Sequence, residues 1–263
     1  MPAKNGFELQ DGDIELLRFA HELRIAQVEH FRTLTGRSKL ALWRRLRKLR
    51  ERRYLASAAR FMQQHIYTIG SAGVPVLIEQ GYAERTLAEK RVRYRELNEI
   101  GLRHALHITN IHTRLLMLTR GTPLKIAVWR EGPALWDTVL PKKGKAAIPI
   151  RPDIYLGLQN MQRPEGKNML HFFIEADRGT MSHERMVQKV IGYLAYHDDH
   201  RFGQKYPGMK SFHVITVTET RGRAASLRDG LGSLITTAPL QRAYRFVAIE
   251  DLTLEAFLPK VAT

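Results

Sequence analysis

Three carboxylates at the ends of two apolar segments have the residue types and spacing of a divalent metal site. Asp153 lies at the start of the segment 150–158, and Glu175 and Asp177 end the segment 171–177. Side chains two residues apart on a strand point to the same face, so Glu175 and Asp177 can converge. If the two strands pair, Asp153 joins them. Hard carboxylate oxygens suit Mg²⁺, which could activate water and stabilise a phosphorane-like transition state.

The basic residues around these carboxylates leave two interpretations open. Arg151 and Arg178 flank the set and could pair with it, in which case the carboxylates are structural. Lys189, on a helix expected over 183–197, could instead position water or stabilise charge in a Mg²⁺-dependent nuclease. The catalytic candidates are therefore Asp153, Glu175, Asp177 and Lys189, and the metal-ligand candidates are the first three of these.

The segment 39–52 is strongly basic and is predicted to form a helix. Leu42, Leu46 and Leu49 recur at helical spacing and form an apolar stripe, while the arginines and lysines fall largely on other faces. The short glycine-containing turn before the segment ends in Ser38, which is a good N-cap. Such a helix can pack on a core through its leucines and present positive charge to a partner.

The elements around this basic helix are those of a winged helix-turn-helix domain. The expected elements are a helix capped by Asp11 or Asp13, a helix over 25–34, and strands over 54–58 and 65–69 around a polar tip at 60–64. Two helices joined by a tight glycine turn, the second of them strongly basic, match the helix-turn-helix pattern. The two strands would form the wing.

In such a domain, residues near the start of the second helix reach base edges, while flanking cations neutralise phosphates. The base-proximal candidates are Arg37, Ser38, Lys39, Ala41 and Arg44. The phosphate candidates are Arg45, Lys48, Arg52 and Arg60. The alternative is a solvated cationic helix or a surface for an acidic protein. The preceding helix, the capped turn and the following strands favour double-stranded DNA.

Composition supports an anionic partner. The 263 residues include 42 Lys and Arg but only 26 Asp and Glu, which gives a formal net charge of +16. Nucleic acid is the commonest partner of such a chain, and an acidic membrane surface is the other candidate. The sequence has neither a membrane-spanning apolar run nor, in residues 1–13, the apolar core of a signal peptide. With no cysteine, disulfides and thiolate sites are excluded, and a cytoplasmic protein is expected.

Two domains are expected because the charge and the residue pattern change along the chain. The proposed division is a winged helix-turn-helix domain over 1–81, a linker and long helix over 82–119, and a mixed-sheet α/β domain over 120–263. The last of these is expected to hold strands over 125–129, 150–158, 171–177, 212–220 and 244–251, with a helix over 183–197. Winged-helix proteins often dimerise on paired half-sites, so a homodimer through the helix at 98–119 is a further hypothesis.

The carboxylate pattern resembles the restriction-endonuclease-like fold. The motif of that fold is Pro-Asp, a spacer, and then Asp/Glu-X-Lys on the next strand. Here Pro152-Asp153 is followed by Glu175-Ala176-Asp177, so Asp177 stands where the lysine is expected. Lys189 on the following helix is a candidate for a migrated replacement.

The order of the whole chain resembles the plasmid replication-relaxation family. The shared features are the winged helix, a histidine-bearing linker helix, Pro152-Asp153, the run Glu175-Ala176-Asp177-Arg178-Gly179-Thr180, and the pair Lys189 and Tyr193 on the next helix. The resemblance implies a DNA-binding protein of a mobile element that acts in plasmid replication or copy-number control. Catalysis does not follow from it. A Mg²⁺-dependent nuclease and a protein that binds RNA or membranes by charge alone remain as alternatives.

Overall fold

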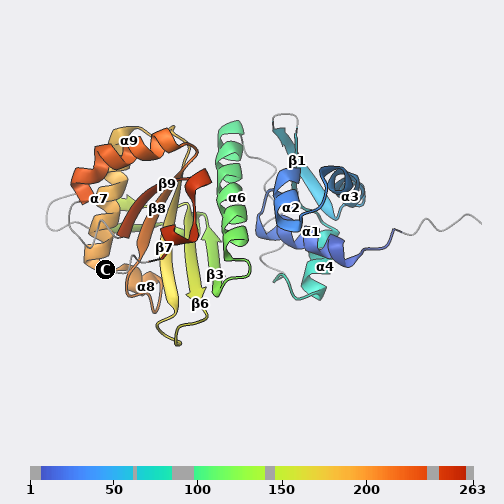
Figure 1. Cartoon of the computed structure of the whole chain (residues 1–263), viewed down its shortest axis with the longest axis horizontal. Helices are drawn as coiled ribbons and strands as arrows, with labels where there is room; N and C mark the ends of the chain where they lie inside the picture. The colour runs from blue at the N-terminus through green and yellow to red at the C-terminus, as the bar shows by residue number, and fades with distance from the viewer. Residues whose placement is uncertain (1–6, 62–63, 85–97, 140–145, 236–242, 259–263) are drawn as a thin grey trace, which may run out of the picture. The chain divides into compact units, whose positions relative to one another are not determined.

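The computed structural model describes residues 7–61, 64–84, 98–139, 146–235 and 243–258. It has a mixed α/β architecture and divides into two compact units, Met1–Thr113 and Arg114–Thr263 (Figure 1). Helix α6 (Glu99–Thr119) contributes residues to both units. Within the described residues, no helix combines the length and the apolar character needed to cross a bilayer.

The first unit contains three helices, a two-stranded antiparallel hairpin and a fourth helix. Their bounds are α1 Asp11–Glu22, α2 Val28–Thr35, α3 Lys39–Glu51, β1 Leu55–Phe61, β2 Gln64–Ile69 and α4 Gly73–Glu79. The expected helices and strands are therefore present in the expected order. Both strands reach further into the predicted tip at 60–64 than expected, since Phe61 lies opposite Gln64 in the ladder.

The starts of the first two helices differ from prediction. The N-cap of α1 is Gln10 rather than Asp11 or Asp13, and Asp13 closes a capping box by accepting a 2.8 Å hydrogen bond from the Gln10 backbone N–H. Helix α2 begins at Val28 because Ala26, expected in the helix, exchanges two backbone hydrogen bonds with Tyr67 of β2. Pairing with a distant strand therefore overrides the local helical pattern.

Helix α3 is confirmed with its apolar stripe facing inward. Gly36 ends α2 with a φ of +71°, a left-handed conformation that glycine adopts without strain. The Ser38 side chain caps α3 by accepting a hydrogen bond from the Ala41 N–H. The buried side chains of α3 are Leu42, Leu46 and Leu49.

The first part of α6 packs within the first unit through apolar and polar contacts. Leu102 and Leu106 join Ile25 in one buried cluster. Next to it, His30 Nε2 lies 2.7 Å from Asn110 Oδ1. Burial lowers the pKa of His30, so this ring is held neutral at physiological pH and fits a buried contact with an amide.

The second unit is built on a five-stranded mixed sheet. Its strands, in spatial order, are β3 Leu124–Glu131, β6 Ile154–Asn160, β7 Met169–Asp177, β8 His213–Thr218 and β9 Tyr244–Ala248. The first three are antiparallel neighbours, and β7, β8 and β9 run parallel. Helices α7 (His183–Asp199) and α9 (Arg221–Leu231) connect the parallel strands and lie on one face of the sheet (Figure 1).

The strand expected over 150–158 is interrupted. Its first residue ends β5 (Ile148–Ile150), which pairs with β4 (Asp137–Val139) in a separate two-stranded sheet, and β6 begins only at Ile154. Pro152 lies between them and has no backbone N–H to donate to a ladder. The last strand also ends early, at Ala248, and a turn of 3₁₀ helix follows.

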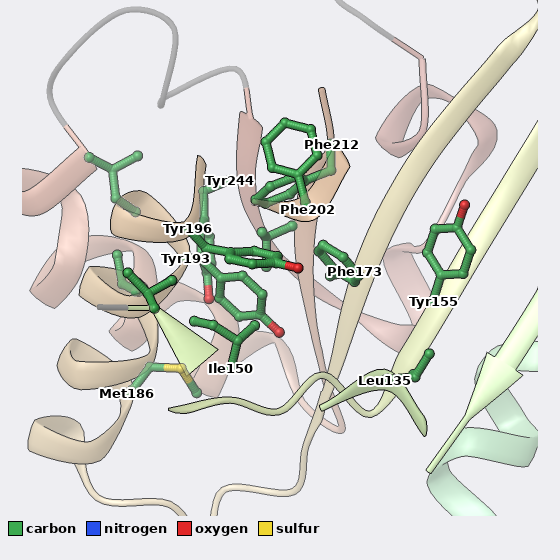
Figure 2. Packing of buried hydrophobic residues seen from close by; sticks show 14 of the residues in the cluster. Leu135, Ile150, Tyr155, Phe173, Met186, Tyr193, Tyr196, Phe202, Phe212 and Tyr244 are labelled. Carbon is green, nitrogen blue, oxygen red and sulfur yellow. The ribbon is translucent and has the colours of Figure 1, made fainter. Parts of the chain in front are cut away.

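The core between the sheet and its helices is rich in aromatic side chains. Phe173 of β7 packs edge-on against Phe212 with ring centroids 4.9 Å apart. Tyr193 of α7 stacks on Phe173 from the helix side (Figure 2). Tyr196 donates a 2.7 Å hydrogen bond to Asp137 in β4. These contacts attach α7 to the middle of β7 and to the separate β4–β5 sheet.

We expect Leu46→Ala to lower the free energy of unfolding of the first unit by about 2–5 kcal/mol, because it opens a cavity at a fully buried position. The matched control is Leu40→Ala on the opposite face of the same helix, where the side chain is 58% exposed and the change should stay within about 0.5 kcal/mol. Chemical denaturation followed by circular dichroism measures both. Equal losses for the two variants would contradict the inward orientation of the stripe.

Candidate functional site

The outer face of α3 presents cations to solvent. Arg44 and Lys48 are exposed one turn apart, and neither forms an ion pair with any described residue. Ala41, a predicted base-proximal residue, is exposed beside them. These three residues have the solvent access that a contact with a nucleic acid requires.

Two of the predicted base-proximal cations are paired with acids. Arg37 donates to the Gly12 carbonyl at 3.1 Å and to Glu15 at 3.0 Å. Lys39 lies 2.8 Å from Glu29 and remains largely exposed, and its interaction lowers the pKa of Glu29. Such exposed pairs contribute little, typically 0–1 kcal/mol, so a phosphate can compete for either cation.

Arg45 has a different environment from the other phosphate candidates. Its guanidinium pairs with the carboxylate of Asp13, which is almost fully buried, and it also lies 4.7 Å from the centre of the Phe7 ring. The hydrogen bond with Asp13 raises the pKa of Arg45. The guanidinium of Arg52 lies 4.5 Å from the centre of the same ring, and Arg52 is exposed. The Arg60 side chain lies outside the described residues.

Sequence reasoning missed three residues on this face. Leu40 and Trp43 are 58% and 47% exposed, and the guanidinium of Arg47 lies 5.9 Å from the Trp43 ring centre. Arg47 also pairs with Glu51 at 2.8 Å. The signal was available, because Leu40 and Trp43 fall outside the stripe formed by Leu42, Leu46 and Leu49 and lie three residues apart, on one face of α3.

The four predicted catalytic residues of the second unit come together. Ile154 lies opposite Ile174 in the antiparallel pair of β6 and β7, which places Asp153 beside Glu175. Asp153 accepts a 2.8 Å hydrogen bond from the backbone N–H of Ala176. Glu175 is almost fully buried and accepts from Lys189 of α7. The second Glu175 oxygen accepts from the Tyr193 hydroxyl.

Asp177 binds a cation that the sequence did not indicate. Arg223, on α9, donates from Nε to Asp177 at 2.7 Å and from Nη2 to the Met181 carbonyl at 2.8 Å. The arginines expected to pair with the carboxylates lie elsewhere: Arg178 is 3.8 Å from Glu219, and Arg151 stacks over the Trp136 ring. The acids of β7 are thus neutralised from the two helices that cover the sheet.

Burial dominates the electrostatics of this cluster. It raises the pKa of Glu175 to about 7, although the charge of Lys189 opposes the rise. Burial lowers the pKa of Lys189, but the charges of Glu175 and Asp153 outweigh it and the net direction is upward. Burial and the Glu175 charge together raise the pKa of Tyr193 well above its usual value. Lys189 is therefore charged, and Glu175 titrates near neutral pH.

This donor set does not fit Mg²⁺ in the arrangement observed. Both Glu175 oxygens accept hydrogen bonds from protein donors, and Asp177 is taken by Arg223. In the part of the chain that the structure describes, no three His, Asp or Glu residues are grouped as metal ligands. The assignment of Asp153, Glu175 and Asp177 to a metal stays a prediction, and the geometry does not favour it.

The fold and these two sites define a two-unit α/β protein with an exposed basic helix in one unit and a buried carboxylate–lysine cluster in the other. Residues 17–211 match the model of a protein family described as replication-relaxation. The chain therefore belongs to the replication-relaxation family, which confirms the resemblance found in the sequence. Membership indicates a role in plasmid replication or mobility. No curated protein and no solved structure matches the chain.

The titration of Glu175 leads to a pH-dependent stability of the second unit. Because its folded pKa is raised above the usual value of 4.5 to about 7, the folded state binds more protons than the unfolded state between these values. Stability from this group is therefore present below pH 4.5 and is lost as the pH rises through 7. The loss is at most about 3 kcal/mol, since one unit of pKa corresponds to about 1.4 kcal/mol.

We expect this component to disappear in Glu175→Gln. The measurement is the difference between the pH profiles of unfolding free energy for wild type and variant. Glu165→Gln, which changes an exposed side chain of the same type, is the control. Parallel profiles for wild type and Glu175→Gln would contradict the raised pKa.

Proposed function

We propose that the first unit is a winged helix-turn-helix domain that binds double-stranded DNA, with α3 as its recognition helix and the β1–β2 hairpin as its wing. The observation that carries the proposal is the division of α3 into two faces. Its leucines are buried in the unit, while Arg44 and Lys48 are exposed and form no ion pair with the described residues. A helix held in this way can enter a major groove with its cations toward the DNA.

The charges on and around α3 fall into two roles in this proposal. Arg44, expected from the sequence to reach base edges, is assigned here to the phosphates together with Lys48 and Arg52, because it is exposed one turn from Lys48. Arg37 and Lys39 can exchange an exposed carboxylate for a phosphate. Arg45 instead holds α3 to α1, because its partner Asp13 is buried. Removing Arg45 would therefore affect folding before it affects binding.

We further propose that the protein acts on the DNA of a mobile element, in plasmid replication or its control, as a binding protein. The second unit would have the restriction-endonuclease-like fold and serve dimerisation or DNA clamping. The antiparallel order of β3, β6 and β7 followed by a parallel β8 supports this fold. Its carboxylates would attach β7 to α7 and α9 through Lys189 and Arg223.

We expect the double variant Arg44→Ala/Lys48→Ala to lose at least tenfold in affinity for duplex DNA at moderate salt, because two phosphate contacts are removed. The slope of log K against log salt should become shallower by about one to two units. Fluorescence anisotropy with a labelled duplex over a salt series measures both quantities.

The matched control is Arg163→Ala/Lys167→Ala, which removes the same charge from exposed positions between β6 and β7 of the second unit. It should change affinity much less. Equal losses in the two double variants would show that net charge alone drives binding, and the recognition-helix proposal would then be rejected.

For the carboxylate cluster we expect no nicking of supercoiled plasmid by the full-length protein with Mg²⁺ or Mn²⁺. The reason is that Lys189 and Arg223 already occupy the oxygens of Glu175 and Asp177. Gel electrophoresis of the plasmid is the measurement. Nicking that is present in wild type and absent in Glu175→Ala would establish the nuclease instead.

A further inference from the structure

The solvent face of α3 carries large apolar side chains among its cations. Leu40 lies in the first turn of the helix and Trp43 at the start of the second, and both are about half exposed. Arg44 and Lys48 follow on the same outer side. Phosphates are bound by charge and hydrogen bonds, so the Leu40 side chain and the carbon face of the Trp43 ring are suited to an apolar group and not to the DNA backbone.

The DNA major groove offers one apolar group for such side chains. Thymine presents its C5-methyl group there, and no other base carries an equivalent group. The first residues of a recognition helix are the ones that face base edges. Leu40 occupies this position in α3, with the methyl group of Ala41 next to it.

We propose that Leu40 and Trp43 read thymine by packing against its C5-methyl group. This inference rests on the proposed DNA-binding function of the first unit and adds its base preference. The protein then binds most tightly where thymines stand at the positions that the start of α3 contacts. The guanidinium of Arg47 lies 5.9 Å from the centre of the Trp43 ring, at the outer limit of a cation–π contact.

Charge favours DNA over an apolar protein as the occupant of this face. Arg44 and Lys48 have no acidic partner among the described residues, so an apolar protein surface would bury both cations without compensation. A duplex supplies methyl groups for Leu40 and Trp43 together with phosphates for the neighbouring cations.

The test compares thymine with uracil, which differs only by the missing methyl group. A duplex is first selected from a random library by the full-length protein and then made in two forms, with thymine or with deoxyuridine. We expect the thymine form to bind about fourfold more tightly for each methyl group contacted, which is the value of one buried methylene-sized group. In Leu40→Ala/Trp43→Ala, the two forms should bind equally.

Two controls separate base preference from charge. Arg44→Ala/Lys48→Ala should weaken binding to both forms and keep their ratio, because phosphates are the same in each. Arg163→Ala/Lys167→Ala should keep both the ratio and most of the affinity. The comparison of the two duplexes on the wild-type chain requires no variant, so it holds even if a substitution impairs folding.

Equal wild-type affinity for the two duplexes overturns this inference and leaves the DNA-binding proposal intact. Failure of the wild-type protein to retain any duplex rejects both. If Leu40→Ala/Trp43→Ala changes the oligomeric mass and keeps the thymine preference, the face is an interface between copies of the chain and the inference is also overturned.

Discussion

The buried carboxylate of Asp13 fixes how the basic helix is held. A carboxylate in this environment is strongly destabilising unless it is paired, and the guanidinium of Arg45 is its partner. Since Asp13 also closes the capping box of α1 with Gln10, one side chain sets the start of α1 and the rotation of α3 about its own axis. The face with Leu42 then packs inward, and Arg44 is left in solvent.

The second unit applies the same constraint with a different outcome. Glu175 and Asp177 lie at the end of a buried strand, and each is compensated by a cation from a helix that covers the sheet. Pairing of this kind makes the positions of Lys189 and Arg223 interdependent with that of β7. A carboxylate array that resembles a metal site in sequence is thus able to act as an attachment between a strand and two helices, because burial demands positive charge and either a metal or a side chain can supply it.

Local patterns predicted the parts of the fold that depend on local spacing. The leucine repeat identified α3 and its buried face, and strand alternation together with helix position brought Lys189 to Glu175. Contacts between distant segments were not predictable in this way. The pairing of Ala26 with Tyr67 moves the start of α2, and Arg223 reaches Asp177 from a helix 46 residues further along the chain. Arg45 is the cation of α3 that pairs inward because Asp13 of α1 lies beside it. The sequence of α3 alone could not predict this choice.

For the DNA-binding function proposed for the first unit, the ion pairs of Arg37 with Glu15 and of Lys39 with Glu29 have a consequence for exchange between sites on DNA. Each of these cations is already paired with a carboxylate of the same chain. A phosphate that binds the cation therefore displaces that carboxylate instead of a free ion from solution. The carboxylate stays within reach and reclaims its partner when the phosphate leaves. Fewer ions are then released for each phosphate contact than the number of basic residues suggests. Because the carboxylate neutralises the cation again when a contact breaks, rapid transfer along the duplex is favoured over long residence.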